Sequence, residues 1–177
     1  LSVGGNNGSG SFSGVIAESG GLTKLGSGTA TLSGENTYTG TTTISNGTLT
    51  YGGSNILSTG AVTINGGTLN IDSYTDTVGA VTLESGSITG TGTLTGSSYA
   101  VKSGAIGAIL GGSAVGLTKS TGGTVTLSGE NTYTGTTTIS AGTLALGADN
   151  VLSDETEVSV TGIFDLADNS DTINVLS

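Results

Sequence analysis

Carboxylates are the chemically active groups that cluster in this sequence, and they do so near its C-terminus. Of the 13 acidic residues in the 177-residue chain, seven fall within 23 consecutive positions. The seven are Asp149, Asp154, Glu155, Glu157, Asp165, Asp168 and Asp171. Such a cluster suggests two kinds of site. One is a calcium site, which needs about six to eight oxygen ligands; the other is the carboxylate pair of a glycosidase.

Both kinds of site lack a supporting motif. The Gly-Gly-x-Gly-x-Asp spacing of calcium-binding toxin repeats is absent, and so is an EF-hand loop. A β-helical enzyme acting on acidic polysaccharide generally needs a cation beside its aspartates. There is no arginine here, and Lys24, Lys102 and Lys119 lie outside the acidic segment. We therefore expect a solvated acidic face with no bound metal.

The composition excludes most other chemistry. Histidine and cysteine are both absent, which removes imidazole-dependent triads, thiolate nucleophiles, the common zinc sites and disulfides. The net charge of −10 argues against a nucleic-acid partner, because binding a polyanion requires a basic surface. We expect a protein without enzymatic activity and without a cofactor.

An asparagine and a tyrosine form the most conspicuous polar and aromatic pair, and the pair occurs twice, at Asn36 with Tyr38 and at Asn131 with Tyr133. One interpretation is a platform on which a sugar stacks. The favoured interpretation is structural. The asparagine bonds main-chain groups at a corner, and the tyrosine caps an apolar row with its hydroxyl in water. Glu35 and Glu130, in the same loops, are expected to be solvated.

A glycine recurs every 18 to 20 residues, and the residue two places after it is apolar in all nine cases. The residue between them is serine or threonine in seven cases. This alternation predicts short strands with one side chain inward and the next outward. The predicted inward ladder is Phe12, Ala30, Leu49, Leu69, Ile88, Ile106, Val125, Leu144 and Phe164.

The regular spacing predicts an all-β fold, a parallel β-helix of about nine coils of 18 to 20 residues. A second inward strand is visible in most coils, as at Thr42 with Ile44 and at Val62 with Ile64. Glycine and asparagine would form the corners. The absence of proline fits strands that pair on both sides.

A longer repeat is superimposed on the short one. Residues 22–58 and 117–153 align without gaps, 95 positions apart, with 27 of 37 identical. We therefore interpret residues 1–177 as a single β-helical segment made of a long repeat, 1–95, and an incomplete second copy, 96–177. We expect it to be part of a longer chain.

The shared run Leu-Ser-Gly-Glu-Asn-Thr-Tyr-Thr-Gly-Thr-Thr-Thr-Ile, preceded by Gly-Leu-Thr-Lys and followed by Gly-Thr-Leu, resembles the passenger-associated repeat of autotransporter proteins. The resemblance covers residues 21–49 and 116–144 well. It implies a right-handed parallel β-helix on, or released from, the surface of a Gram-negative bacterium. It also implies a structural or adhesive stalk.

The resemblance leaves several partners open. Further β-helical repeats of the same chain, or copies joined end to end as an extracellular filament, would cover the ends, and cell-surface or matrix ligands are possible partners. No stretch approaches the roughly 20 apolar residues of a membrane span, so this segment is not expected to insert into a bilayer. Outward Thr-x-Thr pairs such as Thr29 with Thr31 also suggest ice binding, although threonine is a common outward strand residue.

Overall fold

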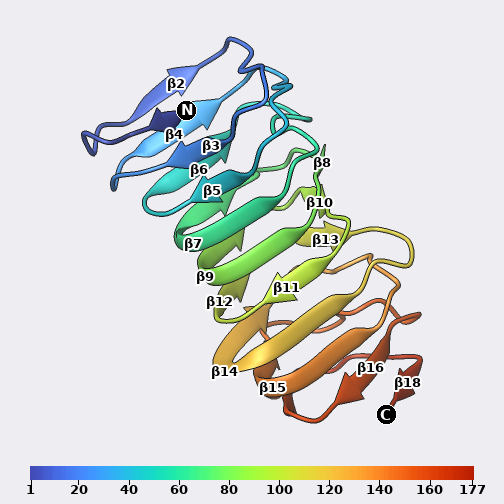
Figure 1. Cartoon of the computed structure of the whole chain (residues 1–177). Coiled ribbons are helices and arrows are strands. Elements are labelled where there is room, and N and C mark those ends of the chain that lie inside the picture. The colour runs from blue at the N-terminus through green and yellow to red at the C-terminus, as the bar shows by residue number, and fades with distance from the viewer.

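The computed structural model describes all residues, 1–177, and the chain forms one elongated β-solenoid without helices (Figure 1). Successive coils stack from the N-terminal end to the C-terminal end, and all strand pairing is parallel and joins neighbouring coils. The predicted all-β parallel solenoid is confirmed. No helix in the structure has the length and apolar character needed to cross a membrane.

The 18 strands lie on three sides of the coil. The first side holds β1 (Ser2–Val3), β3 (Leu22–Lys24), β5 (Thr42–Ile44), β11 (Tyr99–Val101), β16 (Glu157–Val160) and β18 (Val175–Leu176). The second side holds β2 (Gly10–Phe12), β4 (Thr29–Leu32), β6 (Thr48–Tyr51), β12 (Gly104–Ile106) and β17 (Ile163–Asp165). A short third side holds β8 (Asp76–Thr77), β10 (Thr93–Thr95) and β13 (Ile109–Gly111).

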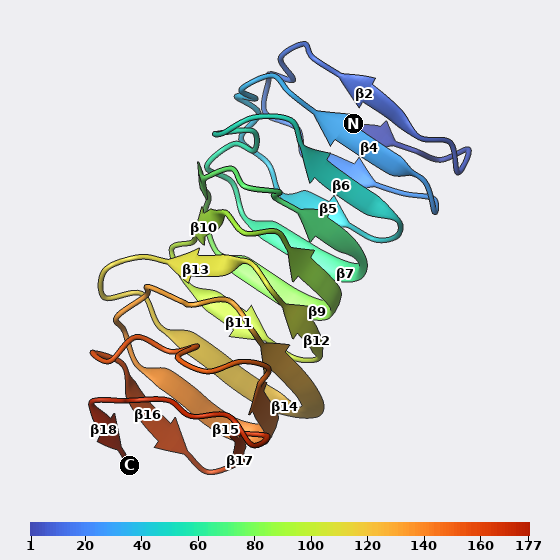
Figure 2. The same ribbon diagram turned by 180° about the vertical axis from the view of Figure 1, so that it is seen from behind.

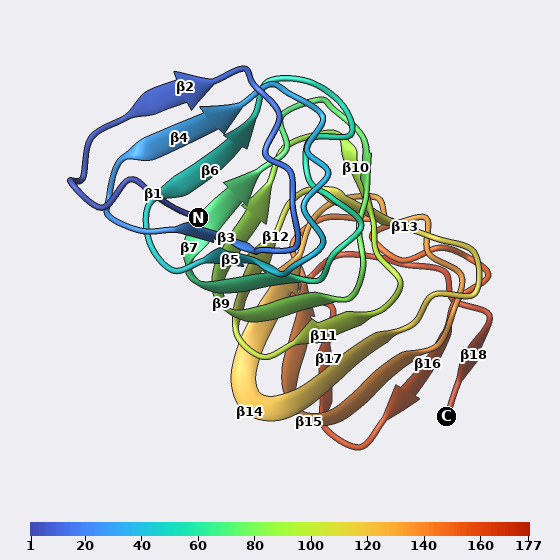
Figure 3. The same ribbon diagram turned by 45° about the horizontal axis from the view of Figure 1, so that its top comes forward.

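Four long strands run around the corner between the first two sides. They are β7 (Val62–Asn70), β9 (Val81–Thr89), β14 (Leu117–Leu127) and β15 (Thr137–Leu146). Figure 3 shows β14 and β15 bending sharply where they pass from one side to the other. Because these strands belong to both sides, fifteen strands form one wrapped sheet. The third side is a separate three-stranded sheet beside mostly irregular chain (Figure 2).

The inner surface of the first side consists of two stacked rows. One row joins Leu22, Thr42 and Val62, and the other joins Lys24, Ile44 and Ile64, each residue aligned with its equivalent in the next coil. These side chains are buried. Such self-stacking requires medium-sized side chains, because neighbouring coils are only about 4.8 Å apart.

The inward row of the second side follows the predicted ladder over much of its length. Leu49, Leu69 and Ile88 stack in register and are buried, and Ile106 aligns with Ile88. Val125 and Leu144 are also buried, whereas Ala30 and Phe164 are half-buried.

The ladder is not continuous, however. Ile106 pairs with Leu127, and Gly104 pairs with Val125, so the row shifts by two residues between these coils. The same offset occurs at the first coil, where Gly10 pairs with Ala30. Because glycine has no side chain, it fits a corner and an inward strand position equally well. The positions of the recurring glycines therefore do not determine the register between neighbouring coils.

Phe12 departs most from the prediction. It pairs with Leu32 rather than with Ala30 and is 48% exposed. Its strand, β2, pairs only with β4, so no coil covers its other edge. Placing Phe12 in the buried ladder was therefore wrong.

The burial of the ladder leads to a test. Leu69 is fully buried, so the Leu69→Asp substitution should lower the free energy of unfolding by about 3 kcal/mol or more, because it buries an unpaired carboxylate. Thr68 points outward beside it, and Thr68→Asp should cost less than about 1 kcal/mol. Urea unfolding measures both variants, and equal losses would contradict the assignment of the two faces.

Candidate functional site

The acidic residues near the C-terminus are dispersed over the surface. Six of the seven are exposed, and only Asp171 is partly buried. No three of the acidic side chains lie close enough to hold a metal ion. Several instead bond main-chain groups: Asp149 Oδ1 accepts from Ser170 N at 2.7 Å, and Asp165 Oδ1 accepts from Ala167 N at 3.0 Å. Their geometry is that of turn-stabilising residues.

The repeated asparagines lie inside the solenoid and connect coils. Asn36 Oδ1 accepts from Ile16 N at 2.7 Å in the preceding coil, while its Nδ2 donates to Ile56 O at 2.6 Å in the following one. Asn131 does the same with Leu110 N at 2.8 Å and Val151 O at 2.9 Å. Each carboxamide therefore bonds main-chain groups of the coils on both sides of its own and so connects three successive coils.

The repeated tyrosines are more deeply buried than predicted. Tyr38 is 1% exposed and Tyr133 is fully buried. Their hydroxyl groups bond Thr42 Oγ1 and Thr137 Oγ1, the latter at 2.7 Å, and burial raises the pKa of both tyrosines. The prediction that the hydroxyl groups lie in water was wrong, since each hydroxyl finds its partner within the coil. A buried ring also offers no face on which a sugar could stack.

A groove of about 460 Å³ opens beside Asn36 and Tyr38. Glu35, Thr37, Ser58 and Asp76 are among the residues that line it. The lining is rich in hydroxyl and carboxyl groups, which are the groups that a hydrolytic site needs. Whether it can do chemistry depends on the buried carboxylate, Asp76.

Asp76 is 3% exposed and holds main-chain groups with both oxygens. Its Oδ2 accepts from Leu57 N and its Oδ1 accepts from Thr77 N, each at 2.8 Å. Burial raises the pKa of Asp76, and the hydrogen bond from Leu57 N opposes this rise. Both oxygens of the Asp76 carboxylate are thus engaged with main-chain N–H groups. The corresponding residue of the second repeat, Asp171, likewise accepts from Val151 N and Leu152 N.

Two lysines are the residues that the sequence analysis missed. Lys24 and Lys119 are fully buried, although lysine is rarely buried without an acidic partner. Lys24 Nζ donates to the carbonyl oxygens of Leu25 at 2.6 Å, Gly26 at 2.8 Å and Asn46 at 3.2 Å. Lys119 Nζ donates to the carbonyl oxygens of Thr121 and Ala141. Burial lowers the pKa of both lysines.

The alternation of inward and outward residues in β3 could have predicted the burial of Lys24. Lys24 stands two residues after the inward Leu22, just as Ile44 stands two residues after Thr42 in the next coil. Lys24 therefore occupies an inward place in a row that is aliphatic in the next four coils, from Ile44 to Val101, and then reaches Lys119. The ammonium group reaches the corner, where carbonyl oxygens point inward and no strand pairing satisfies them.

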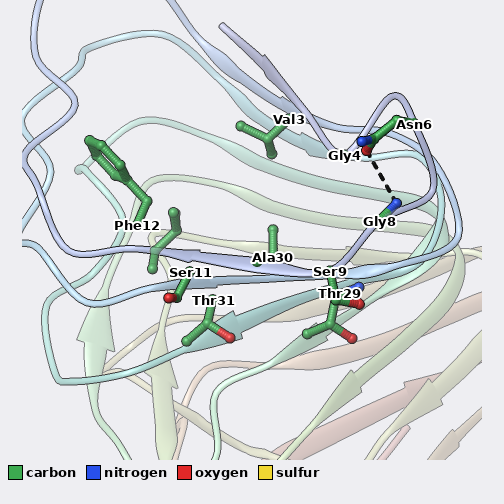
Figure 4. Close-up of a pocket in the computed structure, with 12 residues that line it drawn as sticks. Val3, Gly4, Asn6, Gly8, Ser9, Ser11, Phe12, Thr29, Ala30 and Thr31 are labelled. Carbon is green, nitrogen blue, oxygen red and sulfur yellow. Dashed lines mark hydrogen bonds between the residues drawn. The ribbon is translucent and has the colours of Figure 1, made fainter.

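A second hollow, of about 260 Å³, lies at the uncovered edge of the first coil (Figure 4). Val3, Ser11, Phe12 and Ala30 are among its lining residues, and the figure shows Val3 and Phe12 on the side away from Thr29 and Thr31. Its lining contains no carboxylate or lysine.

One family model matches the segments that contain the repeated side chains. The family model for the passenger-associated transport repeat matches residues 22–50, 52–71 and 117–146. No curated protein and no solved structure matches the chain. The matched segments contain Lys24, Asn36 and Tyr38 together with their counterparts in the second copy, so these buried polar groups lie within the repeat itself.

The buried lysine can be tested against an exposed one. Lys24→Met keeps an apolar stem but leaves three carbonyl oxygens without their donor, so it should lower the free energy of unfolding by about 1 to 3 kcal/mol. Lys102 forms an exposed ion pair with Glu84 at 2.7 Å, and Lys102→Met should cost less than about 1 kcal/mol. The two variants are compared by urea unfolding, and a Lys24→Met protein as stable as Lys102→Met would contradict the role given to the ammonium group.

The raised pKa of Asp76 predicts a pH dependence. A carboxyl group whose pKa is higher in the folded protein than the ordinary 3.8 binds its proton more tightly when folded, so its contribution to stability increases as the pH falls through that interval. The wild type should therefore gain stability relative to Asp76→Asn between pH 7 and about pH 4. Urea unfolding at several pH values measures the difference; a constant difference would show that Asp76 has an ordinary pKa.

Proposed function

Since three segments of this chain are passenger-associated transport repeats, we propose that it is a stalk segment of a Gram-negative cell-surface or secreted protein. In this proposal the segment has no catalytic activity and serves to hold a functional region away from the cell. The observation that carries the proposal is the unbroken stacking of coils from β1 to β18 around one core.

The mechanical basis of a stalk is the direction of its hydrogen bonds. In a parallel solenoid the main-chain bonds between coils run along the long axis, so bending or stretching the rod strains many of them at once. About nine coils at about 4.8 Å each span about 40 Å. The 95-residue repeat adds five coils at a time, which makes length adjustable by duplication.

The absence of catalysis is proposed on chemical grounds. The buried carboxylates accept hydrogen bonds from main-chain N–H groups, and the buried lysines donate to carbonyl oxygens. An acid–base mechanism needs a group that can exchange its proton with a substrate. Besides the engaged Asp76, the groove beside Tyr38 is lined by hydroxyl groups, the carboxamides of Asn36 and Asn55, and one exposed carboxylate, that of Glu35.

A second candidate function, adhesion, is favoured by one surface feature. The outward residues between the two inner rows of the first side stack in register. They form a column of Thr23, Thr43, Thr63 and Thr82, which Ala100 interrupts before Thr118 and Thr138. A straight column of hydroxyl groups suits hydrogen bonding to a repetitive ligand such as a polysaccharide or ice. Threonine at outward strand positions also has the simpler explanation of β-propensity.

The partners proposed for the ends are further β-helical coils. Phe12 and Val15 are exposed at one end, and Ile163 and Leu176 at the other. Coils of the same chain or of a second copy would cover these side chains and pair with the uncovered strand edges.

The stalk proposal predicts how length responds to duplication. Inserting a second copy of residues 22–116 after Gly116 preserves the sequence on both sides of each junction, because Leu117 is the counterpart of Leu22. The longest dimension measured by small-angle X-ray scattering should increase by about 24 Å, which corresponds to five coils at about 4.8 Å. A more compact or disordered protein would contradict the modular rod.

A display experiment separates a spacer from an adhesin. Residues 1–177 are placed between an outer-membrane anchor and a terminal epitope on a Gram-negative cell. The control is a flexible glycine–serine linker of about 50 residues, whose root-mean-square length of about 39 Å matches the length of the rod but which folds back toward the cell. A stalk should make the epitope more accessible to antibody-coated beads than the linker does. Equal accessibility would contradict the stalk, and stronger attachment of the cells to polysaccharide surfaces or to one another would support adhesion instead.

A further inference from the structure

Asn-Gly pairs occur three times in the sequence, as Asn7–Gly8, Asn46–Gly47 and Asn65–Gly66. In such a pair the glycine nitrogen can attack the asparagine carboxamide, because glycine has no side chain to obstruct the approach. The reaction requires that the nitrogen lie next to the side-chain carbonyl carbon. We propose that the folded protein presents Asn46 as a site of spontaneous deamidation and holds the other two asparagines back.

The geometry at Asn46 brings the reacting groups together. Gly47 N donates to Asn46 Oδ1 at 2.8 Å, so the attacking nitrogen faces the carboxamide of its own neighbour. The pair lies in the corner between β5 and β6, outside both strands, and Asn46 is exposed to water. The nitrogen is therefore free of strand pairing, and the leaving group can escape into solvent.

The glycine of this pair is required by the fold. Gly47 has a φ of +61°, and a Cβ atom there would lie 2.4 Å from the carbonyl oxygens of Gly26 and Gly28. No larger residue fits this corner without moving main chain. The structure therefore demands glycine at 47, and the asparagine before it completes the reactive pair.

The other two pairs are held differently. Asn7 Oδ1 accepts from Ser27 N of the next coil at 3.0 Å, and Gly8 N donates to Asn6 Oδ1 at 3.2 Å, so nitrogen and carboxamide are each engaged elsewhere. Asn65 and Gly66 lie at the irregular corner of the long strand β7, where the register shifts on both sides of Asn65, and Asn65 pairs with Ser85 of the neighbouring coil. In neither pair does the glycine nitrogen donate a hydrogen bond to the carboxamide oxygen of the preceding asparagine, as Gly47 N does to Asn46 Oδ1.

The reaction proceeds in two steps, closure of a succinimide ring and its hydrolysis. A bond forms between Gly47 N and Asn46 Cγ while the Cγ–Nδ2 bond breaks, and the amide proton of Gly47 leaves with the nitrogen as ammonia. Water then opens the succinimide. Opening at Cγ gives aspartate, and opening at the main-chain carbonyl carbon gives isoaspartate with a free α-carboxylate. No oxidant or cofactor is needed.

The product charge arises beside a buried cation. Asn46 O accepts from Lys24 Nζ at 3.2 Å, and in isoaspartate this oxygen becomes part of a carboxylate. Lys24 would then have the acidic partner that the original protein lacks. The equivalent corner of the second repeat has Ala141, whose carbonyl accepts from Lys119 Nζ at 3.2 Å and cannot react in this way.

The test compares the three asparagines within one protein. The folded protein is incubated in mildly alkaline buffer, digested, and analysed by mass spectrometry for conversion of carboxamide to carboxyl at each site. Asn46 should convert at least about ten times faster than Asn7 and Asn65, because only its reacting atoms are already adjacent. In concentrated urea, where the fold is lost, the three sites should convert at similar rates.

Two variants identify the source of the signal. Asn46→Gln keeps a carboxamide but needs a larger ring for the same attack, and Asn46→Ala reproduces the corner of the second repeat. Both should abolish the fast release of ammonia from the folded protein. Equal conversion at the three sites of the folded protein, or earlier conversion at Asn7 or Asn65, would overturn the proposal, as would undiminished ammonia release from Asn46→Ala.

Discussion

Each coil of this protein is held in place by the main-chain hydrogen bonds that it exchanges with the coils on either side. The structure has 97 main-chain hydrogen bonds, most of them between neighbouring coils, and a single ion pair, so polar stabilisation comes mainly from the backbone rather than from ion pairs. Parallel pairing in register requires every coil to follow nearly the same path. An inward residue must therefore stack on its equivalents about 4.8 Å away, which favours medium aliphatic residues inside and small residues at the corners.

This constraint leaves main-chain groups unsatisfied wherever the path leaves a strand, and the repeat supplies buried polar side chains at those places. Asn36 and Asn131 connect three coils each, Lys24 and Lys119 bond corner carbonyls, and Asp76 binds two N–H groups. An aliphatic row stacks on any similar row. These polar bonds, in contrast, fit only particular neighbours, which explains why the long repeat of five coils is so much better matched in sequence than one coil is to the next.

The sequence was sufficient to predict the fold. Stacked coils of equal length require similar residues every 18 to 20 positions, and strands require inward and outward side chains to alternate. It was not sufficient to predict the alignment of every coil. Gly10 and Gly104 occupy inward strand positions, whereas the other recurring glycines lie at corners, and the sequence pattern does not distinguish the two cases. Alignment there depends on corner geometry, which the short period does not contain.

The candidate site was predictable in position but not in detail. Repetition of Asn36 and Tyr38 marked an important corner, yet burial of the tyrosine hydroxyl depends on Thr42, four residues away on another side of the coil. Lysine usually prefers solvent, so its residue type predicts that Lys24 faces outward. The alternation of the strand predicts that it faces inward, as the structure has it. Where the two conflict, the alternation was the better guide, because register is shared by the whole sheet.

The central claim is that the coils stack in the register described here, including the shift at Ile106, and engineered disulfides test it most directly in a chain that has no cysteine of its own. Ala105 pairs with Thr126 in the structure, whereas counting from the glycines would pair it with Thr124. Paired positions on adjacent strands are about 4.8 Å apart, within the Cα distance that a disulfide spans, while a two-residue offset exceeds it. Mild oxidation should therefore close a disulfide in the Ala105→Cys, Thr126→Cys double variant and not in Ala105→Cys, Thr124→Cys; the opposite pattern would contradict the account.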